Sequence, residues 1–163
     1  AEGCDTIALA LSVRQTITVV ATAKKIGWTD ANFLGASASF HTAVAKVPGG
    51  ITNGFYASAS WLDLDGRQDV PEVAAWLKEL EAKGEKPSSG GLLGHSAAVA
   101  LVKGLEAAGK DLTPESFRTG MESLSYEDKV LGVQVDYGKD HQGVNDVILS
   151  QIVDGQWVQI TNK

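Results

Sequence analysis

The sequence has little of what marks a disulfide scaffold, a membrane span or a metal centre. Cys4 is its one cysteine, so no disulfide can close within the chain. No apolar run approaches the ~20 residues that span a bilayer, and no secretory signal peptide is recognisable. The three histidines, His41, His95 and His141, lack the paired spacing of metal ligands. We therefore predict neither a metal nor a disulfide framework.

Positive charge is also scarce, which bears on the expected partners. Fourteen Lys and Arg residues stand against twenty Asp and Glu residues, for a net charge of −6. Nucleic-acid binding needs clustered basic residues to neutralise phosphates, whereas Lys24 and Lys25 are the only adjacent basic pair. The sequence contains neither G-x-G-x-x-G nor a P-loop lysine. We expect no nucleic-acid partner and no cofactor.

The first third of the chain alternates strand and helix signals. Short apolar runs predict strands at 5–11, 32–37 and 55–60, the first of them buried on both faces, with Cys4 as a small buried neighbour. Helical spacing lies between them at 17–26, stopped by Gly27, and at 40–47. This β-α-β-α-β order is typical of a parallel sheet with helical crossovers.

The later part of the chain has a different pattern. A helix with Pro71 in its first turn, a second from about Leu92 to Ala108 and a third capped by Thr113 follow one another. A strand is then expected within 129–137. The chain closes with a hairpin around the dipeptide Asp154-Gly155, which favours a type I′ turn. The fold class is therefore α/β, with a parallel sheet and a C-terminal β-hairpin.

The stretch "GHSAA" at 94–98 is close to the G-x-S-x-G turn that presents a serine nucleophile in α/β hydrolases. Such a turn needs a strand directly before the serine, and "KPSSGGLLGH" is too rich in glycine and serine for one. Ser96, Lys103 and Lys110 recur every seven residues, which indicates a helix. We interpret the stretch as a helix N-terminus, with a serine hydrolase using Ser96 as a remote alternative.

Two loops are candidates for ligand binding because each follows a predicted parallel strand, where open α/β sheets bind ligands. Helix N-termini in such loops offer free N–H groups, and serine hydroxyls add hydrogen bonds. Simple helix capping by the serines is the competing interpretation. Carboxylates for acid–base chemistry are absent from both loops, which favours binding without catalysis. The candidate residues are Ser12, Val13 and Arg14 in the first loop, and Ser37, Ala38, Ser39 and Phe40 in the second.

The ordered set of motifs resembles a known family. The runs "CDTIALALSVRQTITVVATAKKIGWTDANFLGAS", "ITNGFYASASW", "VAAWLKELEAKGEKPSSGGLLGHSAAVALVKGLEAAG" and "VLGVQVDYGKDHQGVNDVILSQIVDGQWV" are similar to the carboxyl-terminal part of type I periplasmic solute-binding proteins. These proteins are the Leu/Ile/Val-binding group of ABC importers. The resemblance implies flavodoxin-like lobes joined by hinge crossovers, of which this chain holds an incomplete set. Residues 1–57 and 144–163 would belong to the second lobe, and residues 58–143 to the first.

The resemblance also implies a function. It predicts a periplasmic, or extracellular lipid-anchored, protein that is not an enzyme and binds a small polar organic solute between its lobes. Its partners would be the ligand, an ABC permease and the missing N-terminal portion of the same protein. Trp61 would flank a hinge, and His95 stands where the family has a Tyr-Asp pair at the start of a helix. A ligand-sensing receptor domain of the same fold is the alternative.

The sequence leaves the nature of the solute open. Family members that bind amino acids often carry an acidic residue in the second ligand loop, where this chain has Ser37 or Ala38. The first loop commonly holds a tyrosine, where this chain has Ser12 or Val13. An amino acid, an amide and an aromatic or organic acid are all compatible with these loops, and Arg14 would serve a carboxylate.

Overall fold

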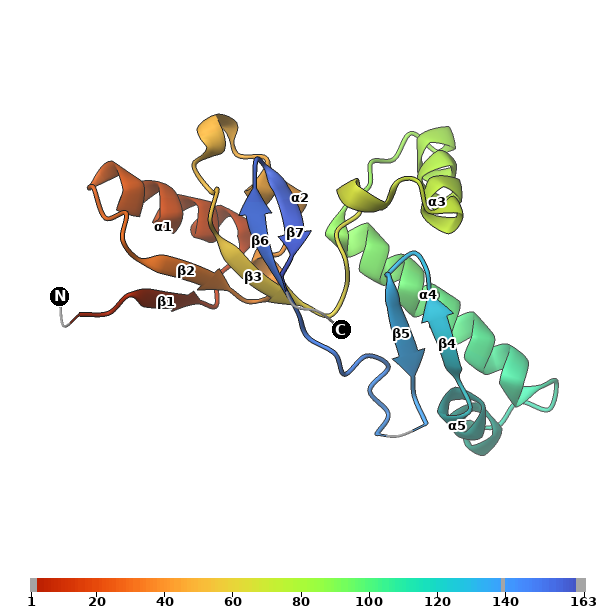
Figure 1. The fold of residues 1–163 in the computed structure, drawn as a ribbon. Helices are drawn as coiled ribbons and strands as arrows, with labels where there is room; N and C mark the ends of the chain where they lie inside the picture. The colour runs from red at the N-terminus through yellow and green to blue at the C-terminus, as the bar shows by residue number, and fades with distance from the viewer. Residues whose placement is uncertain (1–2, 139, 161–163) are drawn as a thin grey trace. The chain divides into compact units, whose positions relative to one another are not determined.

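A computed structural model of the chain describes residues 3–138 and 140–160 (Figure 1). The chain divides into two compact units. Unit 1 comprises the residues up to Arg67 together with those from Val147, and unit 2 runs from Gln68 to Asp146. These borders fall later in the chain than the sequence-based borders at 57/58 and 143/144. The assignment of the units to two lobes stays a prediction.

Unit 1 is built on a five-stranded sheet in the order β1-β2-β3-β6-β7. Its strands are β1 (Thr6–Leu9), β2 (Asn32–Gly35), β3 (Tyr56–Ala59), β6 (Ile148–Val153) and β7 (Gln156–Gln159). β1, β2 and β3 run parallel, whereas β6 and β7 add as an antiparallel hairpin. Asp154 and Gly155 both have positive φ, as the predicted type I′ turn requires. The expected α/β class with a closing hairpin is confirmed, and the sheet is mixed.

The helices of unit 1 pack on one face of this sheet. α1 (Val13–Lys25) and the short α2 (Thr42–Ala45) bury their apolar residues against Phe33, Ala57 and Ile152 of the strands. The residues that alternate with these strand positions are half-buried or exposed, and Val158 of β7 is 45% exposed. The helix predicted at 40–47 is present as α2 but is shorter than expected, and two 3-10 turns, η1 (Ser37–Ser39) and η2 (Pro48–Gly50), lie on either side of it.

The first strand differs from the prediction. β1 is an edge strand, and only Leu9 among its four residues is buried. The expectation of burial on both faces was wrong because, among the described residues, the helices of unit 1 cover one face of the sheet and β1 has a strand neighbour on one side only. Cys4, expected to be a buried neighbour of this strand, is exposed.

Unit 2 combines three helices with a two-stranded antiparallel sheet. Its elements are α3 (Pro71–Ala82), α4 (Ser89–Ala108), α5 (Pro114–Glu122), β4 (Ser125–Asp128) and β5 (Val133–Asp136). β4 was not predicted. α4 begins earlier than expected because the Ser88 hydroxyl accepts a hydrogen bond from the backbone N–H of Gly91, at 3.0 Å. A further 3-10 turn, η3 (Asp65–Arg67), lies at the end of the first segment of unit 1. In the part of the chain described, no helix is both long and apolar enough to cross a membrane.

Candidate ligand-binding site

The predicted ligand loops lie at one edge of the unit 1 sheet. Because β1, β2 and β3 are parallel, the segments that follow their last residues emerge on the same side. These segments are 10–12, 36–41 and 60–62, and they contain most of the residues predicted from the sequence. A hydrogen bond joins the first segment to the second, and a ring contact joins the second to the third. The topology therefore gathers Ser12, Ser37 and Trp61 at a single rim.

The first loop is held by Gln15. The amide oxygen of Gln15 accepts hydrogen bonds from the backbone N–H of Ser12, at 3.2 Å, and from its hydroxyl, at 3.1 Å. Ser12 is exposed and is the N-cap residue of α1, with extended backbone dihedrals. The first N–H groups of a helix have no partner within the helix. The Ser12–Gln15 capping box satisfies part of this terminus, so Val13 and Arg14 carry the N–H groups that have no partner within α1.

Arg14 adds a positive charge at this helix terminus. It is exposed, and the first turn of α1 contains no acidic residue. Among the described residues, no carboxylate forms an ion pair with Arg14 within 4.0 Å. The helix dipole already places partial positive charge here, so a cation in the first turn is unfavourable for stability. Such a local cost is expected where a residue serves a function, and the combined field attracts an anion.

The second loop is fastened to the first by buried hydroxyls. Ser39 is 0% exposed, and its hydroxyl donates to the carbonyl oxygen of Leu11, at 3.1 Å. Since that bond uses the Ser39 proton, the Thr16 hydroxyl, which is also 0% exposed, donates to Ser39 Oγ at 2.8 Å. We interpret Ser39 as a positioning residue, because its polar atom is occupied. Ser37 and Ala38, the two preceding residues of the same η1 turn, are exposed.

Gly35 makes this close approach of the loops feasible. A Cβ atom at Gly35 would lie 2.6 Å from Cβ of Ser39 and 2.7 Å from Cζ of Phe55. Both distances are far below van der Waals contact, so any side chain at Gly35 would push the second loop away from the sheet. Glycine is therefore required at position 35 because it has no side chain, and its backbone does not have a positive φ.

Phe40 was predicted to form an apolar wall of the site. The structure buries it to 3% exposure, with its ring centroid 4.7 Å from that of Trp157 and 6.0 Å from that of Trp61. The Trp157 indole N–H donates to the carbonyl oxygen of His41, at 3.2 Å. Phe40 therefore belongs to the core beneath the loops. Trp61 is only half-buried, so part of its aromatic surface, unlike that of Phe40, is available for contact.

An acidic cluster follows Trp61 along the chain. Burial raises the pKa of the Asp63 carboxyl, and the neighbouring charge of Asp65 raises it further. Asp63 accepts hydrogen bonds from the Thr42 hydroxyl, at 3.4 Å, and from the backbone N–H of Asp65, at 3.3 Å. Asp65 forms an ion pair with Lys46. This cluster ties α2 to the segment that leaves unit 1, and the described residues include no group of three His, Cys, Asp or Glu suited to a metal.

His95 belongs to unit 2, whereas the other predicted residues belong to unit 1. Its ring is half-buried and packs on Trp76 of α3, with 5.4 Å between the ring centroids. The stretch "GHSAA" lies inside α4, whose first residue is Ser89, so the prediction that the helix begins there was wrong. Ser96 is buried within this helix and follows no strand, and His141 instead pairs with Glu122 at 3.0 Å. The geometry of a nucleophile elbow is absent from this part of the described chain.

Sequence reasoning missed Gln15, Thr16 and Gly35, the residues that shape the loops. Thr16 follows the N-cap Ser12 by four residues, which places it one turn into α1 and toward the sheet. A glycine at the last position of a strand is a sequence signal for close backbone approach, and Gly35 fits it. Gln15 stands three residues after a serine N-cap, the spacing of a capping box.

Comparison with protein families gives a match over nearly the whole chain. A family model described as "Periplasmic binding protein" matches residues 1–156. No curated protein matches the sequence.

Solved structures show the same fold. A branched-chain amino-acid ABC transporter protein from Thermus thermophilus with bound valine has a TM-score of 0.81 and 18% identity, over 98% of this chain and 46% of its own. A fatty acid ABC transporter substrate-binding protein from Thermomonospora curvata has a TM-score of 0.79 and 20% identity, over 98% of this chain and 43% of its own. A solute-binding protein from R. palustris in complex with benzoate has a TM-score of 0.73 and 17% identity, over 96% of this chain and 42% of its own. The chain thus spans less than half the length of these relatives.

Proposed function

Because this chain belongs to the periplasmic binding protein family, whose members are non-enzymatic solute-binding proteins, we propose that it forms part of the substrate-binding component of an ABC importer. The component is extracytoplasmic, binds a small organic solute in the cleft between two lobes and delivers it to a membrane permease. Closure of the lobes about their hinges is the step that encloses the solute.

The solute carries a carboxylate in this proposal, and the observation that supports it is the N-terminus of α1. There the exposed Arg14, the backbone N–H groups of the first turn that the Ser12–Gln15 capping box leaves without a partner in the helix, and a first turn without an acidic residue coincide. Ser12, Val13, Ser37 and Ala38 are the further contacts in unit 1, with Trp61 beside them. Valine, a fatty acid and benzoate, associated by name with three structural relatives, all contain a carboxylate.

Titration calorimetry on the full-length protein tests this proposal, with valine, benzoate and decanoate as probes. For the probe that binds, Arg14→Gln is expected to raise Kd by about 10- to 100-fold, because a charge-assisted hydrogen bond contributes about 1.5–3 kcal/mol. The control is Lys25→Gln at the other end of α1, which is expected to leave Kd unchanged. The carboxylate assignment fails if Arg14→Gln binds as tightly as the wild type.

A receptor domain of the same fold is the second candidate function, and the geometry of unit 1 is equally compatible with it. Measuring uptake of the solute by cells distinguishes the importer from the receptor. Loss of uptake on deletion of the gene supports the importer, whereas unchanged uptake with a lost transcriptional or signalling response supports the receptor.

A further inference from the structure

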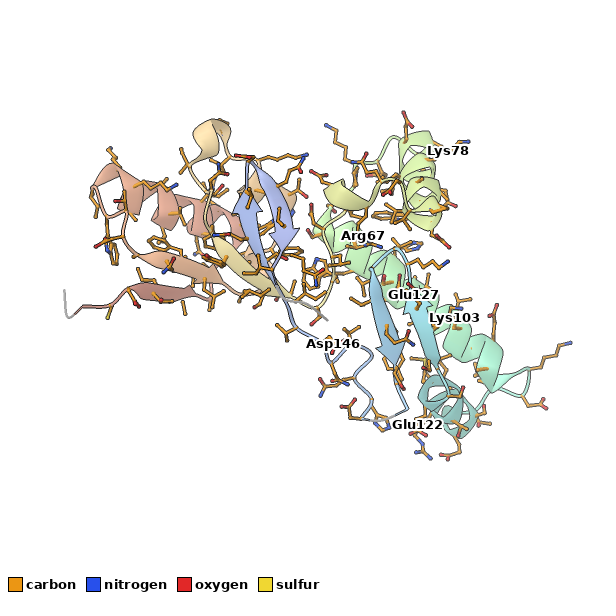
Figure 2. All side chains as sticks on the ribbon, viewed as in Figure 1. Arg67, Lys78, Lys103, Glu122, Glu127 and Asp146 are labelled. Carbon is orange, nitrogen blue, oxygen red and sulfur yellow. The ribbon has the colours of Figure 1, made fainter. Side chains whose placement is uncertain are left out.

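A pocket of about 470 Å³ lies in unit 1 at the end of the sheet opposite the rim. The last turn of α1, the loop that leads to β2, the residues that precede β3, and Gln151 of β6 border it, and the side chains of these elements are drawn in Figure 2. Gln151 pairs with Tyr56, the first residue of β3, so the pocket lies where the parallel strands begin. Small-molecule sites usually have volumes of about 300–1,000 Å³. We name this one the distal pocket.

The floor of the distal pocket is apolar. Val20 of α1, Phe33 of β2 and Phe55, which precedes β3, line it, and all three are buried. Trp28 also lines the pocket but is 37% exposed, and its ring packs edge-on against Phe33, with 5.9 Å between the ring centroids. An aromatic side chain thus offers surface beside an apolar floor.

The position of Trp28 is fixed by the way in which α1 ends. Gly27 has a positive φ of 79° and reverses the chain. The backbone N–H of Trp28 then donates to the carbonyl oxygen of Ala23, at 2.9 Å, which is the longer-range bond of a Schellman motif. The aromatic side of the pocket is therefore formed by the fold itself, before any ligand binds.

Three side chains of the distal pocket have hydrogen-bond donors to spare. The Lys24 ammonium, the Gln151 amide and the Asn32 amide each donate to a backbone carbonyl oxygen, at 3.4, 3.4 and 3.5 Å. These distances exceed the roughly 2.7–3.2 Å that is usual for N–H···O bonds. An ammonium has three N–H donors and an amide has two, so a ligand oxygen at ordinary distance would be the better acceptor.

The charge that lines the distal pocket is positive. Lys24 contributes it, and none of the described residues that line the pocket is Asp or Glu. None of the ion pairs within 4.0 Å in the described part of the chain involves Lys24. A lysine in the last turn also stabilises a helix through its dipole, but Lys25 does so equally and does not line the pocket. The lining therefore favours a ligand with a negative charge.

We propose that the distal pocket is a second small-molecule site of this chain and that it binds an aromatic carboxylate. The carboxylate accepts hydrogen bonds from the Lys24 ammonium and the Gln151 amide, and the aromatic ring packs on Trp28 over the apolar floor. An apolar lining with a few polar groups is typical of small-molecule sites. The proposal uses no residue of the rim, so it does not rest on the proposed function.

The indole N–H signals in the ¹H–¹⁵N NMR spectrum of the full-length protein test the proposal, with benzoate as the probe. The signal of Trp28, identified by its loss in Trp28→Phe, reports on the distal pocket, and the signal of Trp61 reports on the rim. Benzoate is expected to shift the Trp28 signal, and Lys24→Gln is expected to raise the Kd obtained from that shift at least about tenfold. Lys25→Gln is the matched control and is expected to leave this Kd unchanged.

The same titrations can contradict the proposal. A Trp28 signal that does not move in up to about 10 mM benzoate, or that gives the same Kd in Lys24→Gln as in the wild type, would overturn it. So would an equal response to benzyl alcohol, which has the ring without the charge. A Trp28 response that Arg14→Gln weakens as much as Lys24→Gln does would also overturn it, because binding at the rim would then be its cause.

The outcome is separable from that of the proposed function, because the two signals report on opposite ends of the sheet. If benzoate shifts the Trp28 signal through Lys24 while no carboxylate probe binds at the rim, the distal pocket stands and the ligand assignment of the rim falls. If a carboxylate probe binds through Arg14 while benzoate leaves the Trp28 signal unmoved, the reverse holds.

Discussion

Gly104 of α4 and Gly120 of α5 lie directly against each other in unit 2, so that a Cβ atom on Gly120 would meet the carbonyl oxygen of Gly104 at 2.6 Å. The same atom would lie 2.8 Å from the backbone nitrogen of Ala108. Two helix backbones thus touch where neither residue has a side chain. The obstacle is backbone and not a flexible side chain, so it cannot move aside without separating the helices.

Gly120→Ala is therefore expected to destabilise unit 2 by about 2–4 kcal/mol, at or above the usual cost of overpacking. Gly94→Ala is the control, because Gly94 lies within α4 and a Cβ there would meet nothing within 4 Å. It is expected to be neutral or to stabilise by up to about 1 kcal/mol through helix propensity. Urea unfolding measures both, and equal midpoints for the two variants would contradict the close approach.

The Thr16–Ser39 pair predicts coupled effects on stability. Thr16→Val leaves a buried oxygen without its donor and is expected to cost about 1–2 kcal/mol. Ser39→Ala is expected to cost more, because it also removes the bond to the Leu11 carbonyl. In the double variant the cost should fall short of the sum by about 1 kcal/mol. Additive costs in a double-mutant cycle of urea unfolding would show that the two hydroxyls do not interact.

Asp63 predicts a pH dependence with a definite sign. Its pKa in the folded protein is raised by burial, so the unfolded chain releases this proton at lower pH than the folded protein. The contribution of Asp63 to stability is thus greatest when it is protonated and falls as pH rises from about 4 through the raised pKa.

Asp63→Asn should accordingly stabilise the protein at pH 7 and lose that advantage below about pH 4. Asp65→Asn is the opposite case, because it breaks the ion pair with Lys46 and is expected to cost up to about 1 kcal/mol at pH 7. Thermal unfolding between pH 3 and pH 8 compares the three proteins. A lower Tm for Asp63→Asn than for wild type at pH 7 would refute the assigned sign.

Tyr126 predicts a late phenol titration. Burial raises the pKa of its hydroxyl to about 12, and the Asp128 carboxylate acts in the same direction. Because the folded pKa is above the unfolded value near 10, stability is expected to fall as pH rises from about 10 through about 12. Absorbance at the phenolate band should show a step near pH 12 in wild type and in Tyr56→Phe. The same step in Tyr126→Phe would assign it to another tyrosine.

Most of the framework could be predicted because it rests on local signals. Pro71, Thr113 and the pair Asp154-Gly155 each mark a helix start or a turn by their own backbone chemistry, and all three were placed correctly. β4 was missed because "SYED" has no strand alternation of its own and becomes a strand only by pairing with β5. The burial of β1 also depends on its neighbours, which is why the burial on both faces expected from its apolar run was wrong.

The meeting of the two candidate loops at one edge of the sheet was predictable, but the burial of the individual side chains within them was not. Parallel strand order alone brings the two loops to one rim. Whether Ser37 or Ser39 faces solvent depends on how closely the η1 turn packs on the sheet. That packing is set by contacts of Ser39 with Gly35 and Thr16, which are not neighbours in the sequence and so leave no local pattern. Ser39 and Phe40 consequently prove to be buried, although they stand beside the exposed Ser37 and Ala38.

The buried hydroxyl pair has a consequence for how binding specificity can diverge in evolution. The Thr16–Ser39 hydrogen bond joins the two loops beneath the surface, so the backbone of the η1 turn is held without help from the exposed side chains of Ser37 and Ala38. Ser12 differs, because its hydroxyl bonds Gln15 at the start of α1. Under the proposed function, exchanges at positions 37 and 38 would therefore alter the solute contacts at little cost to stability, whereas an exchange at position 12 would also weaken the helix cap.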